Sequence, residues 1–171
     1  MPVILQKNNM ESNQENFDKV KELIDSVKIA MLCTLNEQKF RSRPMSTAQV
    51  DENKNIWFFT NEYSEKTDEI EENHQVCLAY SSPSKNIYVS ISGTATVVND
   101  WVKIKELYNP AIKAWFPEGL DDPKLALLRV TPVDVEYWDS SSSKMVMLFG
   151  MAKAIVTGEK YDAGDHGRLH L

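Results

Sequence analysis

The sequence predicts a single mainly β domain, an antiparallel barrel of six or seven strands interrupted by short helices. Apolar and β-branched segments of strand length recur along the chain and are separated by polar turns. These segments cover 29–35, 41–50, 55–60, 76–81, 86–98, 125–139 and 144–158. The segment 86–98 alternates, with Ile87, Val89 and Ile91 on one face and mostly polar residues on the other. Because closing a sheet removes its exposed edges, we predict a closed or split barrel.

Three helices are expected around the strands, over 15–27, 64–73 and 100–108. Apolar residues at helical spacing between Phe17 and Val27 predict an amphipathic helix that packs on the barrel. Ser64 and Asp100 are good N-caps for the other two helices. Gly93 lies in the middle of a predicted strand, which indicates a β-bulge or the close approach of another group to the backbone.

The length of 171 residues fits one domain, for which we expect an N-terminal extension, a barrel and a tail that is mobile in part. Their boundaries are 1–14, 15–158 and 159–171. A net charge of −6 without a long basic run disfavours general nucleic-acid binding. The chain shows neither a secretory signal nor a membrane-spanning segment. Cys33 and Cys77 lie in apolar runs and are interpreted as reduced core thiols, so we expect a cytoplasmic protein.

Several kinds of site are excluded by the motifs that the sequence lacks. The 6 glycines form neither a dinucleotide-binding fingerprint nor a P-loop. The three histidines, His74, His166 and His170, have no metal-ligand spacing, so no metal site is expected. There is also no nucleophile-elbow motif, and no serine or cysteine has an obvious histidine partner.

A group of cations and hydroxyls remains as a candidate phosphate site. Arg41 and Arg43 are two residues apart and therefore share one face of a strand. Ser64 and Lys66 begin a helix, whose free N–H groups and positive dipole end attract anions. The spacing alone leaves open that these are solvated surface cations. Likewise, aromatic pairs at 115–116 and 137–138 could flank a planar ring or simply pack in a core or subunit interface.

Six segments, taken in order, resemble those of the pyridoxamine 5′-phosphate oxidase-like FMN-binding split barrels, in particular the general stress protein 26 subfamily. They are RPM (43–45), WFFT (57–60), SEK (64–66), VSISGTATVV (89–98), WFP-G-DDP (115–123) and VEYWD (135–139). The resemblance extends from about Val20 to Gly158. It implies a six-stranded antiparallel split barrel that forms a homodimer, with FMN held in the clefts between the subunits.

The resemblance also implies which residues hold the cofactor. Residues expected at the FMN phosphate are Arg43, Lys66, Ser64 and Thr60, with Phe59 beside Thr60 at the strand end. Residues expected at the isoalloxazine ring are Pro44, Met45, Ser46, Tyr88, Trp138 and Trp115. Tyr88 stands where the oxidases have a ring-contacting glutamine, and Trp138 would reach the flavin from the second subunit.

Two departures from the family pattern weaken the case for oxidation of vitamin B6. The oxidases continue after their EFW motif with RLHDR, whose arginine and histidine handle the substrate. In this chain the stretch that follows VEYWD places Lys144 and Val146 there, and GRLHL at 167–171 lies a full strand later, so we interpret it as a coincidence. Ala48 replaces the lysine that ends the oxidases' first FMN strand. The comparison therefore still predicts FMN binding, but it does not predict pyridoxine-phosphate oxidase activity.

The sequence therefore leads to a flavin-dependent oxidoreductase of unknown substrate, in which FMN would carry the electrons. Tyr88, Tyr80 and Lys144 are conceivable acid or base groups, but none stands out, and the catalytic residues stay unassigned. The alternative is a stress protein that stores or shields FMN without turnover. A third hypothesis keeps the barrel and replaces FMN with haem or the deazaflavin F420, although no histidine is placed as an axial ligand.

Overall fold

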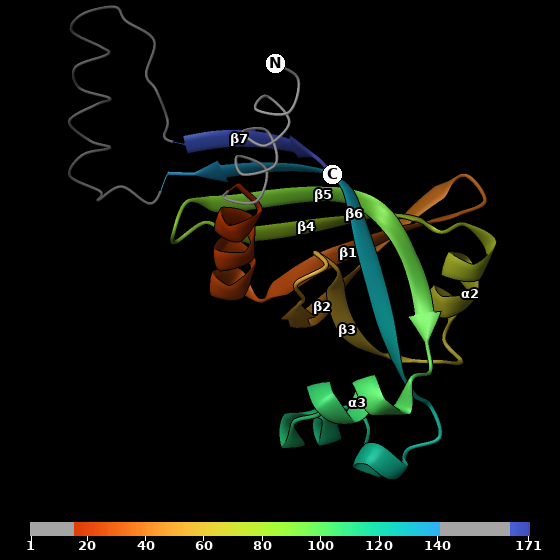
Figure 1. Cartoon of the computed structure of the whole chain (residues 1–171). Helices are drawn as coiled ribbons and strands as arrows, with labels where there is room; N and C mark the ends of the chain where they lie inside the picture. Colours follow the sequence, from red (N-terminus) through yellow and green to blue (C-terminus); the bar gives the residue numbers. More distant parts are fainter. Residues whose placement is uncertain (1–15, 141–164) are drawn as a thin grey trace, which may run out of the picture.

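A computed structural model of the chain describes residues 16–140 and 165–171 (Figure 1). Within these ranges seven strands form one antiparallel sheet in the order β3-β2-β1-β4-β5-β6-β7, and β3 also pairs with β6. The strands are β1 (Ile29–Asn36), β2 (Lys39–Val50), β3 (Ile56–Asn61), β4 (Gln75–Ser82), β5 (Ile87–Val98), β6 (Leu125–Asp139) and β7 (Asp165–His170). The β3–β6 pairing closes the first six strands into a barrel, as the sequence predicts.

One edge of β6 changes its partner halfway along the strand, and this splits the barrel. Residues 125–130 of β6 pair with β3, whereas residues 134–139 pair with β7. Pro132 lies between the two stretches and has no N–H to donate. It faces Gly93 of β5, where the β5–β6 register shifts. Val133 of β6 is the extra residue of this bulge, opposite Gly93, and a Cβ on Gly93 would lie 2.5 Å from the carbonyl oxygen of Thr131, so both the predicted bulge and the predicted close approach occur at this point of the sheet.

The main core fills the barrel and extends under the helix that spans 16–27. Phe17, Val20, Leu23 and Ile24 of this helix are all buried, which confirms the amphipathic pattern. They pack with inward-facing residues of the strands, including Leu32, Leu78 and Ile91. The alternation along each strand therefore separates the barrel interior from an outward face.

A second, smaller core lies outside the barrel wall, where α3 (Trp101–Leu107) and two 3₁₀ turns cover β3 and β6. The turns are η1 (Pro110–Ala114) and η2 (Gly119–Asp121). Trp57, Ile104, Phe116, Leu125 and Leu127 form this cluster. In Figure 1 these helical segments lie at the opposite end of β6 from β7. The remaining helix, α2 (Glu65–Glu72), connects β3 to β4 and contacts β1 and β5.

The last described strand differs from the prediction. The sequence indicates a strand at 144–158, which lies outside the described residues, followed by a tail that is mobile in part. The structure instead pairs β7, within that tail, with β6 over 134–139. Gly167 faces Tyr137, and a Cβ at Gly167 would collide with the tyrosine ring. A glycine-containing polar segment has a weak strand pattern, and its pairing depends on this long-range fit.

Candidate functional site

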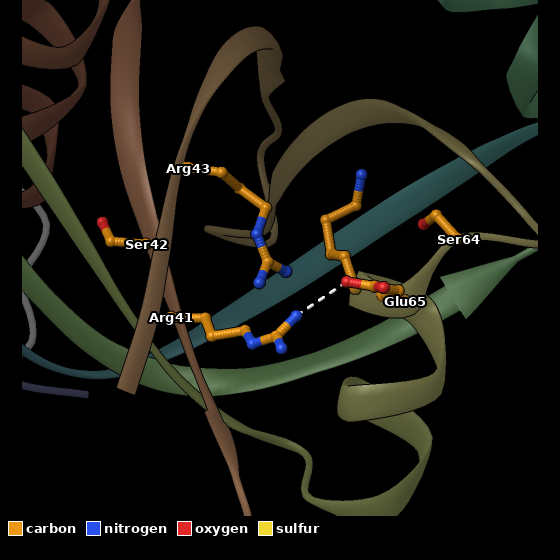
Figure 2. A pocket seen from close by; sticks show the side chains of 6 residues that line it. Arg41, Ser42, Arg43, Ser64 and Glu65 are labelled. Atoms are coloured by element: carbon orange, nitrogen blue, oxygen red, sulfur yellow. Dashed lines mark hydrogen bonds and ion pairs between the residues drawn. The ribbon is translucent and has the colours of Figure 1, made fainter. Parts of the chain in front are cut away.

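A pocket of about 520 Å³ lies between β2 and the start of α2 (Figure 2). The residues that line it are Arg41, Ser42, Arg43, Ser64, Glu65 and Lys66. The two sequence motifs that contribute the predicted phosphate ligands, RPM and SEK, therefore meet in space. Figure 2 shows the side chains of Arg41 and Arg43 extending from one strand towards the beginning of the helix.

The period of the β strand places both arginines on the same side of β2. Arg41 pairs with Thr34 of β1 and Arg43 with Leu32, and both partners are buried. Ser42 lies between the arginines and points to the other side of the strand (Figure 2), where its hydroxyl accepts a hydrogen bond from Cys33 Sγ at 3.4 Å. The two guanidinium groups therefore project into the pocket beneath α2.

The start of α2 is held by a group of short hydrogen bonds around the buried Thr67. The Ser64 N–H donates to Thr67 Oγ1 at 3.1 Å, and this hydroxyl lies 2.6 Å from the Ser64 carbonyl oxygen. Ser64 Oγ donates to the Asn61 carbonyl at 3.0 Å. These contacts fix the first turn, whose early backbone N–H groups have no acceptor within a helix. The helix end is therefore a rigid wall of the pocket.

Glu69 is the residue of the site that sequence reasoning missed. Its carboxylate accepts hydrogen bonds from Arg43 Nη2 at 2.7 Å and from Thr34 Oγ1 at 2.6 Å, and its side chain is only 2% exposed. Arg41 lies 3.4 Å from the same carboxylate and 2.7 Å from Glu65. Burial opposes ionisation of Glu69, but the bonds from Thr34 and Arg43 outweigh it and hold its pKa below the usual value.

Positive charge remains in the pocket after these pairs are formed. Lys66 has no acceptor among the described residues, and burial together with the nearby charge of Arg43 lowers its pKa. Arg43 Nη1 is buried and has no hydrogen-bond partner. A buried unpaired donor beside a second cation is unfavourable unless a ligand satisfies it. The donor set fits an anion with several acceptor oxygens, such as a phosphate group.

The other residues predicted to hold the phosphate lie on β3, away from the lining of this pocket. Thr60 points into the barrel, where its hydroxyl is buried and has no partner. Phe59 packs against the second core, beneath the segments that follow β5. The structure thus groups Arg43, Ser64 and Lys66 but leaves Phe59 and Thr60 outside the pocket lining.

The predicted ring contacts fall into three separate places. Pro44, Met45 and Ser46 continue β2 directly from Arg43, with Met45 in the barrel core. Tyr88 and Trp138 are register partners on β5 and β6, and both are about 40% exposed on the outward face. The Trp138 ring stacks on His166 of β7 with 5.1 Å between centroids. Trp115 is exposed after η1, close to the second core rather than to Trp138.

Of the conceivable acid or base groups, Tyr80 belongs to the core. Its ring is buried, and its hydroxyl lies 2.8 Å from Thr47 Oγ1. Burial raises the pKa of Tyr80 far above the usual value for tyrosine. Tyr80 is therefore a structural group, and Lys144 lies outside the described residues.

The structure places GRLHL beside VEYWD in the sheet. Residues 167–170 belong to β7, which is the strand paired with VEYWD. Arg168 faces Glu136, and its guanidinium donates to Asp134 Oδ2 at 2.6 Å. An arginine and a histidine thus lie next to the Trp138 strand.

Other kinds of site are not seen in the parts that the structure describes. Residues 16–140 and 165–171 contain no group of three or more histidine, cysteine, aspartate or glutamate side chains arranged to hold a metal ion. Nor does any helix within these ranges have the length and apolar character needed to cross a membrane.

Comparison with known proteins identifies the family. A family model described as "Pyridoxamine 5'-phosphate oxidase like" matches residues 15–162. The chain belongs to this family. General stress protein 26 of Bacillus subtilis (strain 168) is 28% identical over 140 residues, which cover 80% of this chain and 98% of that protein. The oxidase-like match includes β2 and α2, and therefore the whole pocket lining.

Two solved structures of relatives share the fold. One, named as a general stress protein 26 from Jannaschia sp. CCS1, has a TM-score of 0.74 and 25% identity, with 95% of this chain and 99% of that chain covered. The other is the general stress FMN/FAD binding protein of Xanthomonas citri, with a TM-score of 0.66 and 30% identity. The match covers 76% of this chain and 92% of the Xanthomonas citri chain.

Proposed function

We propose that this protein binds FMN, with the phosphate in the pocket between β2 and α2. The observation that carries the proposal is the cation pair Arg43 and Lys66, which keeps an unpartnered buried donor and an unpaired ammonium in one pocket. The relative from Xanthomonas citri is described as FMN/FAD binding, which agrees with a flavin ligand. The flavin would supply electron transfer, while Arg43, Lys66 and the α2 amides would bind and orient its phosphate.

The proposed site includes a second copy of the chain. Pro44 to Ser46 follow the pocket on β2 and would run beside the ring, whereas Trp138 lies near the other end of β6 from Leu125. Leu125 pairs with Asn61, which binds the Ser64 hydroxyl at the pocket wall. At about 3.3 Å per residue, β6 separates Leu125 from Trp138 by roughly 40 Å along its path. Trp138 is also on the outward face of the sheet, and we expect it to meet the flavin of the partner in a homodimer, as the family resemblance implies.

Flavin titration tests this assignment because riboflavin has the same ring as FMN and no phosphate. We expect FMN to shift its visible absorption bands and lose fluorescence on binding, and to bind at least about tenfold more tightly than riboflavin. Arg43→Ala and Lys66→Ala should each weaken FMN binding by about 2–3 kcal/mol, roughly thirty- to a hundredfold, and leave riboflavin binding nearly unchanged.

Lys113→Ala is the matched control, because Lys113 is an exposed lysine of η1 outside the pocket lining. This variant should bind FMN as tightly as the original protein. Equal affinity for FMN and riboflavin, or unchanged FMN affinity in both pocket variants, would show that the phosphate does not bind in this pocket. A protein that takes up neither flavin would refute the proposed function altogether.

For the reaction, we favour an oxidoreductase of unknown substrate over a protein that only stores FMN. The position of Arg168 beside the Trp138 strand supports this choice, because a guanidinium near the proposed ring site can orient an anionic substrate. Stopped-flow reduction of the FMN-loaded protein with NADH, NADPH and a substrate panel separates the two functions. The absence of any reduction would favour storage.

The free thiols suit a cytoplasmic location.

A further inference from the structure

Cys33 and Cys77 are direct neighbours on adjacent strands. The antiparallel register of β1 and β4 pairs Cys33 with Cys77, and it is the last pair at that end of the ladder. Both thiols are free and partly exposed on the outward face, where they alternate with buried residues such as Leu32 and Leu78. The prediction that both thiols lie in the core is therefore wrong, because they lie on the outward face of the sheet.

The antiparallel pairing brings the backbones of Cys33 and Cys77 near disulfide distance. Each thiol now bonds to the strand on its far side, Cys33 to Ser42 of β2 and Cys77 to Ser90 of β5. Directly opposed residues have Cα atoms about 4.5–5.5 Å apart, and a disulfide needs roughly 4.4–6.8 Å. Their Cβ atoms lie about 4.5–5.5 Å apart, whereas a disulfide prefers about 3.5–4.5 Å. Closure thus requires an approach of about 1 Å, and it also requires both thiols to leave their present hydrogen bonds and rotate toward each other. The β1–β4 ladder ends at this pair, so the strands can adjust there.

Small molecules have a route to both thiols. Cys33 and Cys77 line a common cavity of about 440 Å³ together with polar residues of β4 and β5, and Phe40 at its rim is 82% exposed. Burial raises the pKa of the Cys77 thiol, so Cys77 is the poorer first nucleophile. The Cys33 thiol is partly exposed and donates a hydrogen bond to Ser42 Oγ on the neighbouring strand.

We propose that Cys33 and Cys77 form a reversible intramolecular disulfide by exchange with a low-molecular-weight disulfide such as oxidised glutathione. The Cys33 thiolate attacks one sulfur of the small disulfide, whose S–S bond breaks, and a mixed disulfide forms with release of one small thiol. The Cys77 thiolate then attacks the Cys33 sulfur and releases the second small thiol. Both protein thiols are oxidised, the small disulfide gains their two electrons, and the two protons leave on the released thiols.

The test uses the full-length reduced protein and oxidised glutathione, followed by thiol titration after unfolding and intact mass. We expect loss of both titratable thiols, a mass lower by two hydrogen atoms, a peptide cross-linked between Cys33 and Cys77, and full reversal by dithiothreitol. Cys77→Ser should stop at the mixed disulfide and carry one glutathionyl group.

The matched control moves one thiol out of register. In the double variant Cys77→Ser/Ala79→Cys the new thiol lies on the same exposed face, at the position opposite Met31. It would be a diagonal neighbour of Cys33 at about 7–8 Å, with the Cβ atoms somewhat closer but still beyond disulfide distance, so disulfide closure should be at least about tenfold slower. Equal closure rates in the two proteins, mixed disulfides that never close, or cross-links only between two chains would overturn the proposal.

Discussion

Glu69 shows how a single buried carboxylate shapes the proposed phosphate pocket. It binds Arg43 and Thr34 and lies near Arg41, so it holds two of the three pocket cations in place. It also neutralises part of their charge. The pocket then depends on Lys66 and on the spare donor of Arg43 for its attraction to an anion. Arg43 and Glu69 are positioned by different elements, which ties β2 to α2.

The lowered pKa of Glu69 predicts how stability depends on pH. The hydrogen bonds from Thr34 and Arg43 stabilise the ionised form in the folded protein more than burial opposes it. The resulting stabilisation is present above the ordinary pKa of 4.5 and is lost as the pH falls below it, through the lower folded value. We expect Glu69→Gln to cost about 1–3 kcal/mol at pH 7 in the flavin-free protein and to flatten the acid branch of the stability curve.

Urea denaturation at several pH values from about 3 to about 7 measures both effects. Glu71→Gln is the control, because Glu71 is exposed on the same helix. A Glu69→Gln protein whose stability equals that of the original, with an equally steep acid branch, would show that Glu69 contributes no charge-dependent stability.

At the scale of elements, the start of α2 depends on a hydroxyl that sequence patterns did not single out. Thr67 is buried, accepts the Ser64 N–H, and lies within hydrogen-bond distance of two backbone carbonyl oxygens. Thr67→Val keeps the shape and removes the hydroxyl. We expect a loss of about 1–2 kcal/mol and a melting temperature lower by about 2–8 °C, with weaker FMN binding because Ser64 and Lys66 lose their fixed position.

Thermal unfolding followed by circular dichroism tests this, with Thr67→Ser as the matched variant that retains the hydroxyl. The serine variant should melt closer to the original protein than the valine variant does. If the valine variant melts at or above the serine variant, the hydroxyl does not hold the helix start.

The individual elements also show which parts of the fold could be predicted from the sequence. Strong alternation and good N-caps predicted the strands from β1 to β6 and the beginnings of α2 and α3, because these depend on neighbouring residues. The Arg43–Lys66 grouping was predicted from motifs. Glu69 was not, since its role comes from β1 and β2, far away in the chain. β7 was missed because its polar sequence becomes a strand only against Tyr137 and Trp138.

For the whole molecule, the exposed position of Trp138 on the outward face of the sheet fits a two-chain site. Trp138 is 39% exposed and stacks on His166, so its removal should leave the barrel intact. We expect Trp138→Ala to retain its far-ultraviolet circular dichroism, to weaken FMN binding roughly tenfold and to alter the flavin spectrum. Loss of folding would instead assign Trp138 a packing role.

Mixing two damaged chains decides whether Trp138 acts across the dimer. In a symmetric dimer each site would take Arg43 from one chain and Trp138 from the other. A mixed dimer of Arg43→Ala and Trp138→Ala chains then has one site with both residues intact and one site with neither. Unfolding and refolding the two variants together should therefore restore tight FMN binding in part of the sites, which neither variant shows alone. If both residues acted within the same chain, every site in the mixture would lack one of them and FMN titration would detect no tight phase.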